Sequence, residues 1–336
     1  MQFVASLTRD PGEIRRLQHM WKGGMDSRTP FRNILVTALF TPPSTLQMLR
    51  EMKEQGQIEN IYFDSGGFYV QMGRLTYEQM YYQLLQFYRD NDWADYYTLP
   101  DSVPLSSDDE VTSWQKVRET ADGTRRFFGE MPSALRDKTL TVIQGRTEEQ
   151  IDYCLETYLP LGIKKLGFGS FATNGKQSST NVMSSESLRI LKYVTDISFS
   201  RGVSVHAFGV GTPPVIYLLD SVGVSSFDSI GWMKTAGFGK VYLPFIRAYN
   251  ITYRDRSARG MPQKTFEKLK ELTGHKCPFC DDFEQLATRR DYRVLHNLAA
   301  IQDTIEIIKN GQTAVLLRLM DEYAPSYSKL RKVLHQ

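Results

Sequence analysis

Short apolar runs alternate with longer amphipathic stretches over most of the chain. The short runs are rich in β-branched and aromatic residues and stop at Gly, Asp or Pro, a pattern typical of buried strands. They predict strands over residues 33–40, 60–65, 96–101, 139–144, 165–169, 204–209 and 225–230.

Helical periodicity fills the stretches between these runs and predicts helices over residues 45–55, 77–91, 109–128, 148–158, 185–201 and 214–221. Alternation of strands and helices predicts a parallel sheet with crossover helices. Seven such strands favour a (β/α)8 TIM barrel over a doubly wound sheet. The glycine fingerprint that opens a dinucleotide-binding fold is also absent from the sequence.

The alternation divides the chain into three parts. Residues 33–242 form the predicted (β/α)8 barrel core, and residues 1–32 are expected to be an N-terminal extension packed on the barrel. After Tyr242 the alternation ends, and short and long helical patterns follow over residues 262–273 and 292–309. We therefore expect residues 243–336 to form a C-terminal helical region that completes the barrel.

Composition narrows the class of protein. The 336 residues are 41% hydrophobic and 24% charged, which is ordinary for a globular protein with a sizeable core. No apolar run approaches the roughly 20 residues of a membrane span, and no secretory signal is evident at the N-terminus. Three cysteines suit a reducing compartment, so a cytoplasmic location is expected. A net charge of +3 permits a nucleic-acid partner only where basic residues cluster.

Four residues near the C-terminus have the spacing of a metal site, H-x-C-x2-C-x15-H: His275, Cys277, Cys280 and His296. Thiolates and imidazoles are the ligands that Zn²⁺ prefers, and four of them close a tetrahedral structural site. The alternative is a loop with two unpaired thiols and surface histidines. Cys154 lies within a helical pattern and is expected to be an ordinary buried cysteine.

Three predicted strands end at or next to an aspartate. Asp64 follows an apolar run in NIYFDSGGFYV, Asp101 follows YYTLP, and Asp228 follows SSF. One such residue is usually a helix cap or a turn residue. Three of them at one barrel mouth, where the chemistry of this fold is located, point instead to catalysis. Paired carboxylates suit double displacement at a sugar carbon, one as nucleophile and one as acid and base.

These motifs, in this order, resemble the tRNA-guanine transglycosylase superfamily. The similar segments are FDSGGF at 63–68, IQG at 143–145, GFGSFA at 167–172, HAFGVGTP at 206–213, FDS at 227–229 and HNL at 296–298. Each motif is of moderate specificity, but the series is highly specific and spans most of the chain.

The resemblance implies a role for each matching residue. Asp228 matches the nucleophile of a covalent glycosyl–enzyme intermediate, and Asp64 matches the general acid and base. Asp101 matches the acid that accepts hydrogen bonds from the Watson–Crick edge of guanine. Gln144 matches the side chain that recognises the purine carbonyl.

Further residues of the same motifs are expected to contact the base. Gly169 and Ser170 match a backbone pair that lies against it, although Ser170 replaces the glycine of the family. Ser65 and His206 lie in matching motifs and are assigned to substrate binding as well. The resemblance also implies one structural zinc ion, bound by His275, Cys277, Cys280 and His296, with His275 in place of a cysteine.

One departure from the family pattern concerns the nucleic acid. The tRNA enzymes continue their nucleophile motif with a P-T-R-x-A-R-x-G segment that grips RNA, whereas residues 229–239 contain no arginine here. This resembles the DNA-modifying branch, the DpdA-type DNA-guanine transglycosylases of phages and bacteria. The resemblance implies exchange of guanine in DNA for a free 7-deazaguanine base, such as 7-cyano-7-deazaguanine, in a bacterial or phage-infected cell.

A base inside a duplex has to be flipped out to reach a barrel pocket, and basic groups would hold the phosphates. The candidates are Lys234, Lys240, Arg247, Arg254, Arg256 and Arg259. The alternative is that they form a solvated surface. A tRNA enzyme with an altered grip and a non-catalytic partner subunit also stay open. The family often forms homodimers, and base exchange requires no redox or nucleotide cofactor.

Overall fold

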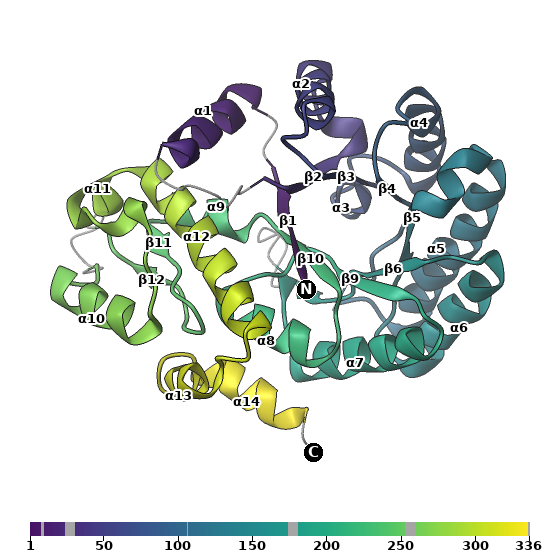
Figure 1. Ribbon diagram of the computed structural model, residues 1–336. Helices are drawn as coiled ribbons and strands as arrows, with labels where there is room; N and C mark the ends of the chain where they lie inside the picture. The colour runs from purple at the N-terminus through teal and green to yellow at the C-terminus, as the bar shows by residue number, and fades with distance from the viewer. Residues whose placement is uncertain (8–9, 24–30, 106, 174–180, 253–259, 335–336) are drawn as a thin grey trace.

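The computed structural model describes residues 1–7, 10–23, 31–105, 107–173, 181–252 and 260–334. Within this part of the chain, parallel strands close into an eight-stranded barrel, in the order β1-β10-β9-β6-β5-β4-β3-β2 (Figure 1). The strands are β1 (Gln2–Ser6), β2 (Asn33–Thr37), β3 (Asn60–Asp64), β4 (Tyr96–Thr98), β5 (Thr139–Ile143), β6 (Lys165–Phe168), β9 (Ser204–Ala207) and β10 (Ser226–Ser229). The predicted (β/α)8 barrel is confirmed.

The eighth strand lies where the sequence analysis placed only an N-terminal extension. Strand β1 pairs with β10 on one side and with β2 on the other, and these two ladders close the barrel. Residues 1–32 therefore begin with a barrel strand, and the assignment of this strand to a packed extension was wrong. This strand has only five residues and stands at the start of the sequence. No helical pattern precedes it, so the alternation of strands and helices could not identify it.

Most of the observed strands are shorter at their carboxyl ends than predicted. Strand β2 gives way to a 3-10 turn at Ala38–Phe40, and β4 ends at Thr98 rather than at Asp101. Pro100 contributes to the early end of β4 because it has no N–H to donate to the ladder. The residues past each strand end are therefore loop residues at the mouth of the barrel.

The helices α1 (Pro11–Lys22), α2 (Pro43–Glu54), α4 (Tyr77–Asp90), α5 (Glu110–Glu130), α6 (Glu148–Tyr158), α7 (Ser185–Ser200) and α8 (Pro213–Ser221) follow the strands in turn. Several begin at side-chain caps, such as the capping box of Thr76 before α4. Short elements α3 (Gly67–Gln71) and α9 (Gly231–Gly237) follow β3 and β10. Both short helices therefore follow a strand end that carries one of the candidate acids.

The C-terminal region consists of helices α10 (Gln263–Thr273), α11 (Phe283–Thr288), α12 (Arg290–Lys309), α13 (Ala314–Tyr323) and α14 (Pro325–Val333). Helix α12 packs against α8 and α9 and also contacts α1, so it covers the barrel between the last strand and the first helix (Figure 1). The region completes the helical layer, whereas the sheet is closed by β1. Two-stranded sheets form between β7 (Ala172–Thr173) and β8 (Asn181–Val182), and between β11 (Lys240–Val241) and β12 (Tyr249–Asn250).

Side chains along the strands alternate between the barrel interior and the helical layer. Tyr62 belongs to a small cluster of residues inside the barrel, together with Val4, Leu35 and Leu140. Its neighbour Phe63 faces the opposite way and stacks on Tyr88 of α4. Because the middle of the barrel is filled, any site formed by the strands has to lie at an end of the barrel.

Candidate active site and metal centre

A cavity of about 390 Å³ lies at the carboxyl ends of the strands. Its polar lining comes from residues far apart in sequence: Ser6, Thr37, Asp64, Ser65, Thr98, Asp101, Gln144, Asp228 and Lys234. Apolar lining includes Leu35, Val142, Phe68 and Phe208. The three aspartates identified from the sequence therefore border one space, as expected for the mouth of a barrel.

Asp228 is buried, and its two oxygens have three hydrogen-bond donors, one on β1 and two on β9 or directly after it. Oδ2 accepts from the Ser6 hydroxyl at 2.6 Å, and Oδ1 accepts from the Gly209 N–H at 2.8 Å. His206 Nε2 lies 3.3 Å from Oδ1. Neutral donors thus compensate for the burial of the carboxylate, and no lysine or arginine among the described residues forms an ion pair with it.

Asp64 lies in a different environment. Within the described part of the chain, its Oδ2 accepts only a 3.2 Å bond from the Gly66 N–H and a long 3.4 Å bond from the Thr37 hydroxyl. Removal from solvent, reinforced by the negative charges of Asp101 and Asp228, raises the pKa of Asp64 to about 7. A carboxyl group with this pKa both releases and takes up a proton near neutral pH.

Asp101 and Gln144 form one hydrogen-bonded unit. Asp101 Oδ1 accepts from the Ser65 hydroxyl at 2.7 Å, and Oδ2 accepts from Gln144 Nε2 at 2.7 Å. Burial raises the pKa of Asp101, and these two hydrogen bonds oppose the rise. The second Nε2 hydrogen of Gln144 and the remaining lone pairs of Asp101 are left for a ligand.

Ser170 holds the side-chain amide of Gln144 in place by a hydrogen bond. Its hydroxyl donates to Gln144 Oε1 at 2.5 Å and accepts from the Gly145 N–H at 2.8 Å. Gly169 lines the cavity, whereas Ser170 is not part of the lining. Ser170 therefore orients the amide of Gln144, and its hydroxyl does not face the cavity.

Two glycines provide the space that this arrangement needs. A Cβ on Gly67 would lie 2.6 Å from Asp101 Oδ1, which is closer than side chains approach one another. A Cβ on Gly167 would lie 2.2 Å from the ring of Phe208. The double glycine after Asp64 thus lets Asp101 reach the mouth, and Gly167 lets Phe208 form part of the cavity wall.

The basic residues that are candidates for phosphate contacts differ in where they lie. Lys234 lines the cavity, and burial lowers its pKa. Lys240 and Arg247 are exposed, and the Arg247 guanidinium lies 5.0 Å from the centre of the Tyr249 ring. Arg254, Arg256 and Arg259 lie outside the described residues.

Several cavity residues had no signal in the sequence. Ser6 lies on the strand that was not predicted, and Thr37 lies in a strand without a recognisable motif. Thr98 is 1% exposed and lines the cavity, and its Oγ1 has no hydrogen-bond partner among the described residues. A buried hydroxyl in this state is available to a ligand or to water.

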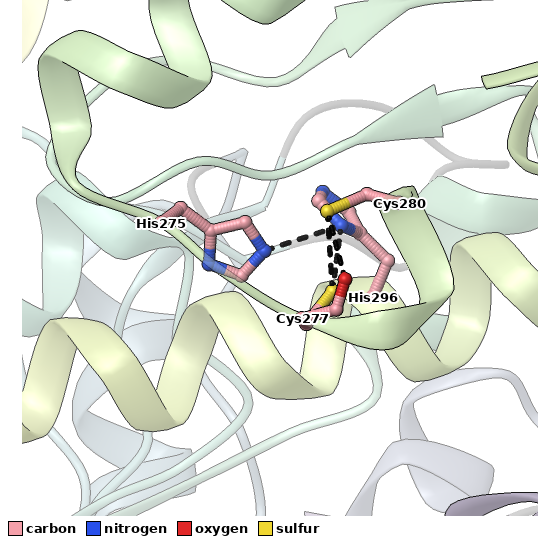
Figure 2. Close-up of side chains that lie close together, drawn as sticks. All are labelled: His275, Cys277, Cys280 and His296. Carbon is pink, nitrogen blue, oxygen red and sulfur yellow. Dashed lines mark hydrogen bonds between the residues drawn. The ribbon is translucent and has the colours of Figure 1, made fainter. Parts of the chain in front are cut away.

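The metal site predicted near the C-terminus is supported by the geometry of its four residues. The ligand atoms of His275, Cys277, Cys280 and His296 are buried and lie within 4.8 Å of one another (Figure 2). His296 Nδ1 is 3.3 Å from His275 Nε2 and 3.4 Å from Cys277 Sγ. The four residues can therefore hold a metal ion.

The outward nitrogens of both imidazoles have acceptors. His275 Nδ1 lies 2.7 Å from Asp303 Oδ2, and His296 Nε2 lies 2.8 Å from the Tyr242 carbonyl oxygen. Each histidine then carries its hydrogen on that outward nitrogen and directs the lone pair of the other inward, as metal-binding histidines do. A hydrogen bond from Cys277 lowers the pKa of the Cys280 thiol, which favours the thiolate that binds metals.

The remaining sequence expectations concern cysteine and membrane. Cys154 is buried and unpaired, as predicted. Among the described helices, none combines the length and apolar character needed to cross a bilayer.

No model of a known protein family matches the chain, and no curated protein matches it at a significant level. The function is therefore argued from the site itself.

Proposed function

We propose that this protein exchanges guanine in DNA for a 7-deazaguanine base, such as 7-cyano-7-deazaguanine, through a covalent glycosyl-aspartate intermediate. The main observation that supports this proposal is the pair Asp64 and Asp228, which border one cavity in contrasting environments. Asp228 is held by neutral donors, and Asp64 has a pKa raised to about 7. Two carboxyl groups with separate environments are the usual basis for separate roles as nucleophile and as acid and base.

In the first half of the reaction, a carboxylate oxygen of Asp228 attacks C1′ of the target nucleotide. The bond between C1′ and guanine N9 breaks, and its electron pair stays on the base. Asp64 gives its proton to the departing guanine, so that guanine leaves as a neutral molecule. The product of this half-reaction is an ester between Asp228 and the abasic sugar.

In the second half, the incoming 7-deazaguanine occupies the place of guanine. Asp64, now ionised, removes the proton from N9, and N9 attacks C1′ from the side opposite the ester. The ester bond breaks and returns its electron pair to Asp228. Asp64 ends the cycle protonated, so the exchange needs no external acid, base or energy source.

Recognition of both bases falls to the unit formed by Asp101 and Gln144. The carboxylate of Asp101 accepts from the N1–H and the amino group that guanine and 7-deazaguanine share. The free Nε2 hydrogen of Gln144 suits the carbonyl oxygen of either base. Phe68 and Phe208 line the same cavity and provide apolar surface for a flat ring.

The DNA part of the proposal rests on the absence of arginine from residues 229–239 and on Lys234 at the cavity. Lys234, Lys240 and Arg247 are the described candidates for phosphate contacts. We assign Zn²⁺ to the Cys/His cluster because two thiolates and two imidazoles are a common structural zinc set. The ion is assigned a structural role, since its ligands are buried and do not border the cavity.

The test is incorporation of labelled guanine, with DNA and tRNA offered separately, followed by trapping of the covalent adduct. We expect label in DNA and an adduct that Asp228→Asn abolishes, with exchange reduced by at least about 10³-fold. Asp220→Asn, at an exposed aspartate of α8, is the matched control and should behave as wild type.

Each alternative gives a different result in this assay. Label in tRNA alone would replace the DNA substrate by tRNA. Binding of nucleic acid without adduct or exchange would indicate a non-catalytic subunit. Full activity of Asp228→Asn would remove Asp228 from the mechanism.

A further inference from the structure

We infer that His206 is a positioning residue, which holds the carboxylate of Asp228 so that one defined oxygen attacks the sugar. This inference rests on the proposed function and changes the role of His206, which the motif alone assigned to substrate binding. It follows from where the imidazole lies, which tautomer its neighbours impose, and how the donors divide between the two oxygens.

The imidazole lies behind the nucleophile rather than in the cavity wall. His206 is fully buried and is not part of the cavity lining. Its ring stacks on Tyr62, with centroids 5.6 Å apart and planes at 26°, and meets Phe208 edge-on at 4.8 Å. Aromatic rings on two sides prevent the imidazole from turning toward a bound base.

Hydrogen-bond partners fix the tautomer. Nε2 faces Asp228 Oδ1 at 3.3 Å, and an ionised carboxylate only accepts, so Nε2 carries the hydrogen. Nδ1 lies 2.9 Å from the Ser226 hydroxyl and accepts its hydrogen. Ser226 and Asp228 are alternate residues of the same strand, β10, so one strand sets both ends of the imidazole.

The groups around the imidazole keep it neutral. Burial lowers the pKa of His206, and the positive charge of Lys165 lowers it further, against the opposing effect of Asp228. Lys165 reaches this region through Tyr62, whose hydroxyl lies 3.3 Å from Lys165 Nζ. A neutral imidazole shares one hydrogen with Asp228, whereas a protonated one would form an ion pair and weaken the nucleophile.

The donors divide unequally between the two carboxylate oxygens of Asp228. Oδ1 accepts from the Gly209 N–H and from His206, both in the segment at the end of β9. Among the described residues, Oδ2 accepts only from the Ser6 hydroxyl. We therefore assign Oδ2 as the attacking oxygen, because it retains more lone-pair capacity.

In the covalent step, a lone pair of Oδ2 forms the bond to C1′ while the bond from C1′ to N9 breaks. The electron pair of the broken bond goes to N9, which takes its proton from Asp64. His206 keeps its own hydrogen throughout and acts only through Asp228. Its loss should therefore slow attack on C1′ without altering how the base is bound.

The test compares His206→Leu, which removes the donor, with His206→Gln, whose Nε2 can still donate to Asp228. Single-turnover adduct formation should fall by about 10- to 100-fold in His206→Leu, as for loss of a hydrogen bond to a charged group. His206→Gln should recover most of that rate. The KM for the incoming base should stay within about twofold of wild type in both variants.

His19→Gln, at an exposed histidine of α1, is the control for loss of a histidine. Circular dichroism and melting temperature show whether each variant is folded. A His206→Leu protein that forms adduct at the normal rate but has a raised KM would overturn the positioning role in favour of base binding. Failure of His206→Gln to recover any rate in a folded protein would also contradict it.

A spectroscopic readout separates this inference from the proposed function. In ¹⁵N NMR spectra of the wild-type protein, His206 should be a neutral imidazole protonated at Nε2, and Ser226→Ala should mix the tautomers. A hydrogen on Nδ1 would overturn the inference even if base exchange is observed. Absence of adduct from the wild-type protein would refute the proposed function, and the tautomer would still decide whether His206 donates to Asp228.

Discussion

The cavity at the barrel mouth and the Cys/His cluster are both groups of polar side chains, but they are built in opposite ways. The cluster takes three of its four ligands from residues 275–280, and its ligand atoms are buried. The mouth takes its residues from positions as distant as Ser6 and Asp228 and leaves a cavity of about 390 Å³. A closed set of soft ligands suits a structural ion, whereas an open set of carboxylates suits turnover.

The cluster and the mouth also differ in how their charges are balanced. In the cluster, Asp303 and the Tyr242 carbonyl accept from the outward nitrogens of the two imidazoles, and the thiolates can be neutralised by one cation. At the mouth, burial and the repulsion between the carboxylates raise the pKa of Asp64 to about 7, so this side chain keeps its proton up to about that pH. Loss of a cluster residue should therefore reduce stability, and loss of a mouth residue should reduce rate.

Among the variants that compare these two regions, the largest effect is expected for Asp64→Asn. Asparagine has nearly the same shape but cannot transfer the proton, so base exchange should fall by about 10²- to 10⁴-fold. Metal content and melting temperature should stay at wild-type values, and Asp92→Asn, at an exposed aspartate, is the control. Steady-state exchange together with elemental analysis makes the measurement. Unchanged turnover would show that the two regions do not divide the roles in this way.

Cys280→Ser should have the opposite profile. We expect near one equivalent of zinc per chain in the wild-type protein, and its loss in this variant. The free energy of unfolding should drop by about 3 kcal/mol or more, because metal binding contributes directly to folding. Urea denaturation measures the change, and Cys154→Ala, at the buried cysteine outside the cluster, is the comparison. A metal-free wild-type protein of normal stability would refute the structural role of the cluster.

Asp303 tests whether the outward contacts of the histidines matter to the metal. Asp303→Ala removes the acceptor of His275 Nδ1 and should weaken zinc binding by about 10- to 100-fold. Asp303→Asn retains an acceptor oxygen and should lose less. Competition with a chromophoric chelator gives both affinities. Equal affinity in the wild-type protein and both variants would mean that the contact between Asp303 and His275 does not affect metal binding.

The smallest step, about tenfold for each pH unit, is expected in the dependence of the rate on pH. Burial and the charges of Asp101 and Asp228 raise the pKa of Asp64 from 3.8 to about 7, so its carboxyl is protonated below that pH and ionised above it. Because guanine departure needs the proton in the proposed reaction, adduct formation should decline above about pH 7, by about tenfold per pH unit. Single-turnover rates between pH 5 and pH 9 would show this decline.

The mutation Asp101→Asn sharpens this test. It removes one of the charges that raise the pKa of Asp64, so the decline should begin at lower pH. The position of the decline is the readout, since the overall rate will also change through weaker base binding. A decline that stays in place would mean that Asp64 does not respond to Asp101.

Local patterns in the sequence are enough to predict much of this protein. Apolar periodicity and turn residues are set by neighbours in the chain, so they predict the alternating strands and helices and hence the barrel. The four-residue metal site is also largely local, because Cys277 and Cys280 lie within a single turn. The acids at strand ends follow from the same reasoning, since parallel strands all end at one mouth.

Other features depend on contacts that no local pattern encodes. Ser6 and Asp228 are 222 positions apart and meet only because β1 pairs with β10 and closes the barrel. The directions of Ser170 and His206 were likewise decided by packing, which turns one toward Gln144 and the other toward Asp228. The sequence by itself determined which residue types stand at each strand end. Tertiary structure decided which of them share a hydrogen bond, because register and burial bring together side chains from distant strands.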